Sequence, residues 1–199
     1  MGTMSESGTP PAPERQGRAP SICVFCGSSP GSHKAYAKAA ARLGRLIGEA
    51  GMDLVFGGGD IGLMGETARA VRATGRRVTG ILPEFLRYLE PPLAQGEVLE
   101  IAADLQERKR RMLAQADAFV LLPGGLGTLD EFFEVVTSAQ LKVLPKPIMA
   151  VDVDGFYAPL RVLLEHVVKQ GFAREEVLAL CRFVPTADEA VAVLREVLG

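Results

Sequence analysis

The sequence has little of several residue types that mark metal, redox or disulfide chemistry. Its 199 residues contain no tryptophan, two histidines and three cysteines. The histidines lie far apart, so no metal-ligand spacing exists and we expect no metal. Three cysteines are too few for a disulfide framework. Cys23 and Cys26 match C-x-x-C but lie in the apolar run SICVFC, where residues three apart on a strand point to opposite faces. We interpret them as small buried hydrophobic residues rather than a redox pair.

Excess charge and long apolar runs are also absent. Lys and Arg number 22 against 24 Asp and Glu, a net charge of −2, which predicts no general attraction to nucleic acid or acidic lipid. No apolar run approaches the roughly 18–20 residues of a membrane span, and the N-terminus lacks the apolar stretch of a signal peptide. We therefore expect a cytoplasmic protein without membrane or nucleic-acid partners.

The chain length predicts one domain with a substantial core. Residues 1–19 are rich in Pro, Gly, Ser and charge and have little to bury, so we expect a disordered or cloning-derived tail. Residues 20–199 are predicted to form a single Rossmann-like nucleotide-binding domain.

Apolar runs alternate with amphipathic stretches along that domain. Strands are predicted at 21–26, 53–56, 77–82, 98–101, 118–122 and 147–151, and helices at 33–50, 62–74, 104–116, 129–141, 157–170 and 186–197. This alternation predicts an α/β fold, a Rossmann-like doubly wound parallel sheet with helices on both faces. In such sheets ligands bind beyond the carboxyl ends of the strands, where the strand order reverses.

Three loops that follow strands are rich in glycine: GSSPGS (27–32), GGGDIGLMG (57–65) and PGGLGT (123–128). Each precedes a helix, whose N-terminus carries partial positive charge, and glycine lets backbone N–H groups approach an anion. The loops therefore predict a phosphate-bearing ligand. No G-K-[ST] marks a Walker-type ATP site. Gly57, Gly59 and Gly62 match G-x-G-x-x-G, but not after the first strand, so NAD is disfavoured.

The predicted helix over 104–116 carries a cluster of cations. Its apolar stripe consists of Leu105, Met112, Leu113 and Ala116. Arg108 and Lys109 project along that stripe, whereas Glu107, Arg110 and Arg111 project away, and Glu107 and Arg111 form a favourable i,i+4 pair. A cation turned toward a core costs several kcal/mol or so unless an anion meets it. We expect that anion to be a phosphate or a carboxylate such as Glu131.

Two roles for Glu131 are open from the residues alone. Thr128-Leu-Asp-Glu131 matches a capping box, in which Thr128 caps the helix and Glu131 reaches back to the cap. Glu131 also lies off the predicted apolar stripe Leu129, Phe132, Phe133 and Val136, as an active-site carboxylate does, and the two roles are compatible. Val135 lies off the stripe too, so this helix is apolar on two sides, as at a subunit interface or inside a monomer.

Four segments in order resemble the signature segments of the LONELY GUY family: CVFCGSSPG (23–31), GGGDIGLMG (57–65), ERKRRM (107–112) and PGGLGTLDE (123–131). The resemblance runs from about residue 20 to the C-terminus and includes KPIMAVDVDGFY (146–157). Members are cytokinin riboside 5′-monophosphate phosphoribohydrolases, formerly described as lysine decarboxylases. The resemblance implies a homodimer or higher homo-oligomer that hydrolyses the N-glycosidic bond of a nucleoside 5′-monophosphate without cofactor or metal, giving free base and ribose 5-phosphate.

The same resemblance places the family's catalytic arginine and glutamate on Arg108 and Glu131. Its nucleotide contacts fall on Lys109, Gly124, Gly125, Gly127, Thr128 and Thr137, and the other two glycine loops bring in Ser28, Gly58, Gly59 and Met64. The chain departs from the pattern at Leu105-Gln106, at Ala94, where an acidic residue is usual and Glu90 or Glu97 is a substitute, and at Ser138 and Lys142. These positions bear on the preferred base.

Two other classes of protein compete with the hydrolase. A non-catalytic protein of the same fold, which binds a nucleotide or carries molybdenum cofactor, would use comparable glycine loops. A decarboxylase that uses pyridoxal phosphate needs a Schiff-base lysine and a partner for the pyridinium nitrogen. Lys109 and Lys142 are available, but nothing marks such a partner, so the decarboxylase is disfavoured.

Overall fold

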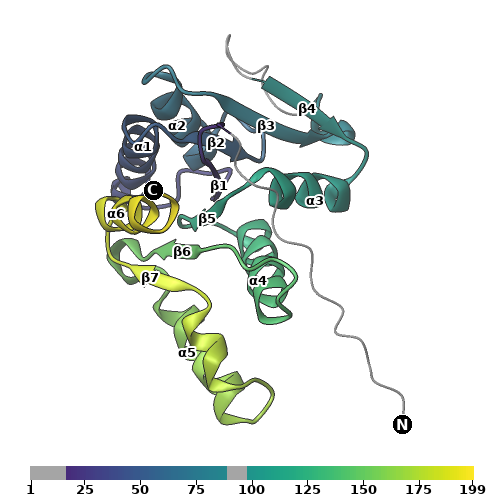
Figure 1. Cartoon of the computed structure of the whole chain (residues 1–199), viewed down its shortest axis with the longest axis vertical. Helices are drawn as coiled ribbons and strands as arrows, with labels where there is room; N and C mark the ends of the chain where they lie inside the picture. Colours follow the sequence, from purple (N-terminus) through teal and green to yellow (C-terminus); the bar gives the residue numbers. More distant parts are fainter. Residues whose placement is uncertain (1–16, 89–97) are drawn as a thin grey trace.

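The computed structural model describes residues 17–88 and 98–199, and within them seven strands form one parallel sheet. The strand order is β4-β3-β2-β1-β5-β6-β7 (Figure 1). The strands are β1 (Ser21–Phe25), β2 (Asp53–Phe56), β3 (Val78–Pro83), β4 (Val98–Ala102), β5 (Ala118–Leu121), β6 (Ile148–Val151) and β7 (Arg182–Val184). All the pairings are parallel, with Ile22 of β1 opposite Leu54 on one side and Ala118 on the other. The predicted sheet is therefore confirmed.

Helices cover both faces of the sheet, as predicted. One face carries α1 (Lys34–Glu49), α2 (Gly62–Arg72) and α6 (Ala187–Leu198), and the other carries α3 (Leu105–Gln115), α4 (Leu126–Gln140) and α5 (Ala158–Lys169). Alternate residues of each strand enter opposite core layers: Ile22 packs with Leu43 of α1, and Cys23 packs with Phe132 of α4. Short 3-10 turns cover Glu84–Leu86, Val153–Gly155 and Glu175–Ala179.

The two cysteines of the C-x-x-C pattern lie in different core layers, Cys23 with α3, α4 and α5 and Cys26 with α1, α2 and α6. Both are buried free thiols. Burial raises the pKa of each thiol well above its usual value, so both stay protonated near neutral pH. The interpretation as buried hydrophobic residues is confirmed.

The strand order reverses between β1 and β5. The chain leaves β1 toward α1 on one face and leaves β5 toward α4 on the other. The loops after β1, β2 and β5 are held together here by backbone hydrogen bonds: Gly27 N–H donates to the Pro123 carbonyl (3.0 Å), and Leu63 N–H donates to the Gly27 carbonyl (3.0 Å). The three glycine-rich loops thus meet at the reversal point.

The segment KPIMAVDVDGFY (146–157) forms hydrogen bonds near the carboxyl ends of β5 and β6. The buried hydroxyl of Tyr157 donates to the Leu122 carbonyl at 2.6 Å, just before the loop that begins at Pro123. The Tyr157 N–H donates to Asp152 Oδ1 at 2.6 Å, which ties the turn after β6 to the start of α5. These bonds anchor the end of β5, from which the third glycine loop departs.

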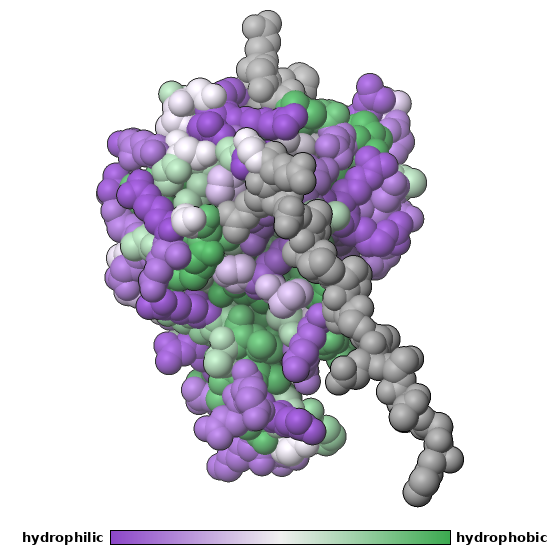
Figure 2. All heavy atoms as spheres, in the orientation of Figure 1, coloured by the Kyte–Doolittle hydropathy of each residue, from purple (hydrophilic) through white to green (hydrophobic). Residues whose placement is uncertain are grey.

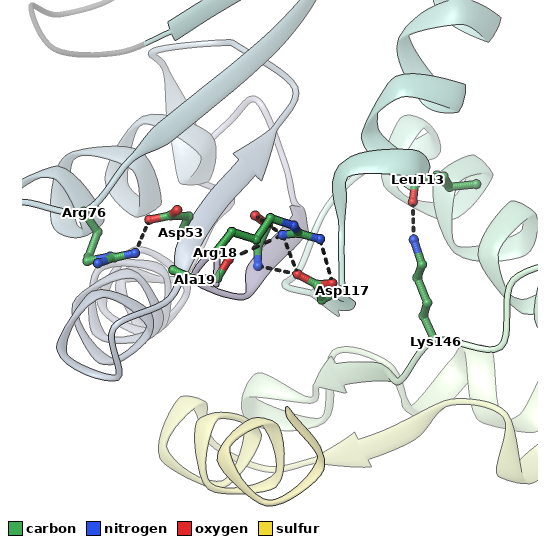
Figure 3. A network of polar contacts seen from close by, with 8 residues as sticks. Arg18, Ala19, Asp53, Arg76, Leu113, Asp117 and Lys146 are labelled. Carbon is green, nitrogen blue, oxygen red and sulfur yellow. Dashed lines mark hydrogen bonds and ion pairs between the residues drawn. The ribbon is translucent and has the colours of Figure 1, made fainter. Parts of the chain in front are cut away.

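Ion pairs lie at the amino ends of strands β1, β2 and β5, opposite the glycine-rich loops (Figure 3). Arg18 forms two hydrogen bonds of 2.9 Å with Asp117, whose carboxylate also accepts from the Ser21 N–H, and Arg76 pairs with Asp53 at 2.7 Å. Arg18 falls inside the expected tail 1–19, so ordered contacts begin two residues before the predicted domain. Residues 1–16 of that tail lie outside the described residues, as do Glu90, Ala94 and Glu97.

Two elements differ from the prediction. The strand β7 (Arg182–Val184) was not predicted, because its three residues are too few to show a period. Helix α4 begins at Leu126 instead of 129, which changes the environment of Glu131. Within residues 17–88 and 98–199 the structure has no helix that is both long and apolar enough to cross a membrane.

Candidate active site

The glycine-rich loops enclose an open cavity of about 390 Å³ at the reversal point. This volume falls in the ~300–1,000 Å³ range of small-molecule sites. The residues that line it come from all three loops, from the end of β3 and from helices α2, α3 and α4: Cys26, Gly27, Ser28, Gly57, Met64, Leu82, Leu86, Arg108, Gly125, Leu126, Gly127, Thr128 and Glu131. The cavity is therefore where the strand-order rule places a ligand.

Arg108 and Glu131 meet in this cavity. Arg108 Nη2 lies 3.4 Å from Glu131 Oε1, and Arg108 Nε donates to the Ile81 carbonyl of β3 at 3.2 Å. Glu131 is 6% exposed, and 16% of the Arg108 side chain is accessible. The structure thus brings together the two residues predicted to be catalytic, and the anion expected beside Arg108 is the carboxylate of Glu131.

The predicted capping box is wrong. The cap residue of α4 is Gly125, which makes no side-chain cap hydrogen bond, and Thr128 lies inside the first turn of the helix. Leu126 and Gly127 precede Thr128 in that first turn. Glu131 therefore lies on the second turn, directed toward Arg108 and not toward the helix end. Of the two roles left open by the sequence, only the cavity carboxylate fits this geometry.

The buried face of α4 also differs from the predicted apolar stripe. Its members are Thr128, Glu131, Phe132, Val135 and Val136. Phe133, which was predicted on the stripe, is 41% exposed, whereas Val135 is fully buried in the core of the chain. The apolar character of Val135 is therefore explained within the monomer. The buried face of α4 therefore differs from the predicted one, and it includes Glu131.

Burial raises the pKa of Glu131 to about 7, although the nearby Arg108 guanidinium opposes the shift. An ordinary glutamate titrates near 4.3. A carboxyl group that titrates near neutrality exists in both protonation states at physiological pH, which is the property that acid–base catalysis requires. The electrostatics of the site therefore depend on how completely Glu131 is buried.

Glycine is required at several positions for packing. A Cβ on Gly57 would lie 2.1 Å from Arg108 Nη2, so the guanidinium occupies the space that a side chain would take. Gly62 has φ +59°, and a Cβ there would meet the Ser28 backbone at 2.4 Å. A Cβ on Gly125 or Gly127 would meet no atom within 4 Å, and both residues line the cavity. Of the described glycines that line the cavity, these two leave open space for a ligand.

The residues predicted to bind substrate divide into two groups. Ser28, Met64, Gly125, Gly127 and Thr128 line the cavity, whereas Gly58, Gly59, Gly124, Lys109 and Thr137 do not. Thr137 is exposed further along α4. A Cβ on Gly124 would lie 2.1 Å from Thr128 Oγ1, so this glycine serves the packing of the loop.

Lys109 is buried, as its place on the helix predicted, and within the protein it pairs with two carboxylates other than Glu131. Its Nζ lies 2.9 Å from Asp130 Oδ2 and 2.6 Å from Glu134 Oε2. Leu105, predicted on the same stripe, is 45% exposed, because it lies in the first turn, where α3 has not yet reached the core. The predicted pair of Glu107 and Arg111 is present.

Sequence reasoning missed the apolar side chains of the cavity. Leu82 at the end of β3, Leu86 in the following 3-10 turn and Leu126 at the start of α4 line it. The rule that ligands bind beyond the carboxyl ends of strands also applied to β3, but the loop after it lacks the glycines that drew attention to the others. Among the described residues, no group of three or more His, Cys, Asp or Glu side chains is arranged to hold a metal.

A doubly wound sheet with glycine-rich loops around a cavity at its reversal point defines a Rossmann-like α/β protein with a place for a ligand at that point. Residues 64–194 match the family described as "Possible lysine decarboxylase". The cytokinin riboside 5′-monophosphate phosphoribohydrolase LOG of Oryza sativa subsp. japonica is 44% identical over 186 residues, which cover 92% of this chain and 76% of that protein. A relative of the same enzyme name from Arabidopsis thaliana is 42% identical, over 92% of this chain and 84% of its own. The chain belongs to this family of phosphoribohydrolases.

Solved structures share the fold at low identity. The molybdenum cofactor carrier protein of Chlamydomonas reinhardtii has a TM-score of 0.69 and 19% identity, over 91% of this chain and 99% of that one. The molybdenum cofactor binding protein of Rippkaea orientalis has a TM-score of 0.68 and 18% identity, over 92% and 99%. At this identity the likeness concerns the fold, and function must be argued from the site.

The space beside Gly57 gives a prediction. In Gly57→Ala the new methyl group would displace the Arg108 guanidinium from its place beside Glu131, and we expect kcat/KM to fall about 10²-fold, the effect of a misplacement of about 1 Å. Steady-state kinetics measures this. Because the displaced atoms are the end of a flexible side chain, the free energy of unfolding should change by less than about 1 kcal/mol. Unchanged kinetics would show that the position of Arg108 is not critical.

The raised pKa of Glu131 predicts a pH-dependent cost to stability. An acid whose pKa is higher in the folded state destabilises that state as it ionises, from the unfolded value near 4.5 up through about 7. Relative to Glu131→Gln, the wild-type protein should therefore lose about 3 kcal/mol of unfolding free energy between pH 4.5 and pH 8, at 1.36 kcal/mol per pKa unit. Urea unfolding across this range measures the difference. A constant difference would contradict the raised pKa.

Proposed function

We propose that this protein hydrolyses the N-glycosidic bond of a nucleoside 5′-monophosphate, of the cytokinin or adenosine type, to free base and ribose 5-phosphate. The observation that carries the proposal is the buried pair of Arg108 and Glu131 beneath the glycine-rich loops. Relatives that bear the name phosphoribohydrolase, at 42–44% identity over most of the chain, support the same reaction.

The 5′-phosphate would bind at the start of α4. Gly125 and Gly127 leave open space there, and the first backbone N–H groups of a helix are unpaired donors at the positive end of its dipole. Thr128, in the same turn, adds a hydroxyl at the cavity wall. A phosphate held at this point converts binding energy remote from the reaction into alignment of the sugar.

Glu131 would face the anomeric carbon. Cleavage of the N-ribosyl bond passes through an oxocarbenium-like sugar, which an adjacent carboxylate stabilises. A pKa of about 7 also lets this carboxylate accept a proton from the attacking water. Glu131 is the one carboxylate among the described residues that line the cavity. Arg108 would orient it and meet the nucleotide or the departing base.

The apolar wall of the cavity supports a nucleoside as the substrate. Met64, Leu82, Leu86 and Leu126 line the same cavity as the charged pair. An apolar surface with a few placed polar groups is the usual lining of a site for a small organic ligand. These side chains would pack against the base while the glycine loops hold the phosphate.

Replacing Glu131 tests the reaction. Glu131→Gln keeps the shape of the side chain but cannot ionise, so release of free base from AMP and from isopentenyladenosine monophosphate should fall about 10²–10⁴-fold. Chromatography of the free base measures turnover, and calorimetry with AMP should show retained binding as the control. A variant with undiminished turnover would reject Glu131 as the catalytic group. Binding of AMP without base release by the wild-type protein would favour the non-catalytic alternative.

We propose further that the protein is a homodimer or higher homo-oligomer. Phe133, Leu141 and Val143 are 41–71% exposed along the outer side and end of α4, and Val162 and Leu163 are exposed on α5. Figure 2 shows apolar residues gathered in the lower half of the visible face, around the position of α5 in Figure 1. Apolar surface gathered in this way is typical of subunit contacts.

Light scattering tests the assembly. We expect a mass of at least twice the 21.2 kDa chain, because the exposed apolar side chains of α4 would be buried between copies. Leu141→Glu should shift the mass toward the monomer, whereas Lys38→Glu on the exposed side of α1 should leave it unchanged. A monomer at micromolar concentration in the wild-type protein would contradict the proposal.

A further inference from the structure

The hydrogen-bond ladder between β1 and β5 slips where the two strands end. The Leu122 N–H donates to the Phe25 carbonyl at 2.9 Å, in register with the pairing along both strands. Bonds in a parallel ladder are evenly spaced, so the Leu122 carbonyl would next accept from the N–H of Gly27. That N–H donates instead to the Pro123 carbonyl at 3.0 Å. The slip leaves the Leu122 carbonyl outside the ladder, directly before the third glycine-rich loop, PGGLGT (123–128).

The Tyr157 hydroxyl takes the place of the missing ladder bond. Leu122 is fully buried, so its carbonyl cannot reach water, and a buried carbonyl without a partner is unfavourable. The Tyr157 hydroxyl donates to this carbonyl at 2.6 Å from the start of α5. Burial raises the pKa of Tyr157 well above its usual value, so the hydroxyl stays protonated near neutral pH. A side-chain bond therefore replaces a backbone bond at the end of β5.

Tyr157 is itself held from several sides. Its N–H donates to Asp152 Oδ1 at 2.6 Å, and its ring packs edge-on against Phe156 and Phe183, with ring centroids 5.0 and 6.1 Å apart. Tyr157 is 1% exposed and is not among the residues that line the cavity. Its hydroxyl is thus a fixed point in the core, to which the end of β5 is bonded.

The first and third glycine-rich loops are in backbone contact just beyond this point. A Cβ on Gly124 would lie 2.9 Å from the Gly27 nitrogen and 2.1 Å from Thr128 Oγ1. Gly125 then caps α4, and Thr128 in the first turn lines the cavity. A displacement of the Leu122 carbonyl therefore reaches, within a few residues, the helix start whose N–H groups would bind the phosphate.

We propose that Tyr157 is a positioning residue, which fixes the point at which the third glycine-rich loop leaves β5 and thereby the start of α4. Without its hydroxyl, the Gly27 N–H would turn back to the Leu122 carbonyl and restore the ladder, which would move Pro123 and the residues that follow it. The inference rests on the proposed function for the phosphate that this helix start would hold. It extends the site to a side chain in the core, outside the cavity.

Tyr157→Phe tests the role, because it removes the hydroxyl and keeps the ring. We expect the Kd for AMP, measured by calorimetry, to rise about 10-fold, since the helix start moves away from the phosphate. The Kd for adenosine, which has no phosphate, should stay within about a factor of two. In the protein without ligand, the backbone amide resonances of Gly27, Gly125 and Gly127 should shift in ¹⁵N NMR spectra, because the hydrogen bond of Gly27 changes its acceptor.

Thr74→Val is the matched control for a loss of stability alone. The Thr74 hydroxyl also donates to a backbone carbonyl, that of Val71 at 2.6 Å, beyond the C-terminal end of α2. Valine keeps the branched shape and removes this bond. We expect a lower midpoint of urea unfolding with no change in the Kd for AMP or in the glycine amide resonances.

A second pair of variants acts on the anchor of Tyr157. Asp152→Ala removes the acceptor of the Tyr157 N–H and should weaken AMP binding in the same direction by a smaller factor, whereas Asp152→Asn keeps an oxygen acceptor and should bind AMP as the wild-type protein does.

Two outcomes would overturn the proposal. One is a Tyr157→Phe protein with wild-type AMP binding and unshifted glycine amides, and the other is an equal loss of AMP and adenosine binding, which would indicate general damage to the site. Absence of base release by the wild-type protein would reject the proposed function, whereas the amide resonances would still decide whether Tyr157 positions the loop.

Discussion

The structure of this site depends on one buried carboxylate and the guanidinium beside it. Removing the charge of Glu131 from water is unfavourable, and the proximity of Arg108 at 3.4 Å offsets only part of that cost, so the pKa stays at about 7. Several other features of the chain make room for this pair or bond to it. Gly57 leaves room for the guanidinium, and the Ile81 carbonyl at the end of β3 receives its Nε–H. The early start of α4 turns the carboxylate toward the sheet.

The two helices that supply the pair also carry a second set of ion pairs, between Lys109 of α3 and the carboxylates Asp130 and Glu134 of α4. Successive residues of a helix are separated by about 100° of rotation, so the neighbouring side chains of Arg108 and Lys109 point in different directions. One reaches into the cavity and the other reaches along α4. On α4 the same geometry sends Glu131 one way and Asp130 and Glu134 the other. Together these ion pairs link one turn of α3 to one turn of α4 at three points.

The sequence predicted the sheet, its two helical layers and the meeting of three loops, because each depends on periodicity or on glycine next to a strand. It also predicted that Arg108 needs an anion, either a phosphate or a carboxylate such as Glu131, from the cost of turning a cation toward a core. It could not place the start of α4, since a glycine-rich segment can open a helix or precede one, and the capping-box pattern favoured the later start. The three residues of β7 were too short to show alternation. Leu82 and Leu86 reach the cavity only through the tertiary arrangement of β3, which no local pattern records.

The fold alone does not determine the reaction, and the pair of Arg108 and Glu131 is what distinguishes this site. Proteins that share this fold at 18–19% identity include molybdenum cofactor carriers, so glycine loops at a reversal point define a place for a ligand and not a chemistry. Among the cavity residues, Cys26 has a pKa raised by burial and remains a neutral thiol, and the leucines are inert. The carboxyl group of Glu131, in contrast, is kept near its titration point at neutral pH by burial. That burial costs the folded state free energy whenever the group is ionised, and such local instability is a common property of catalytic sites. The side chain on which the proposed reaction depends is thus one whose ionisation costs the folded state free energy.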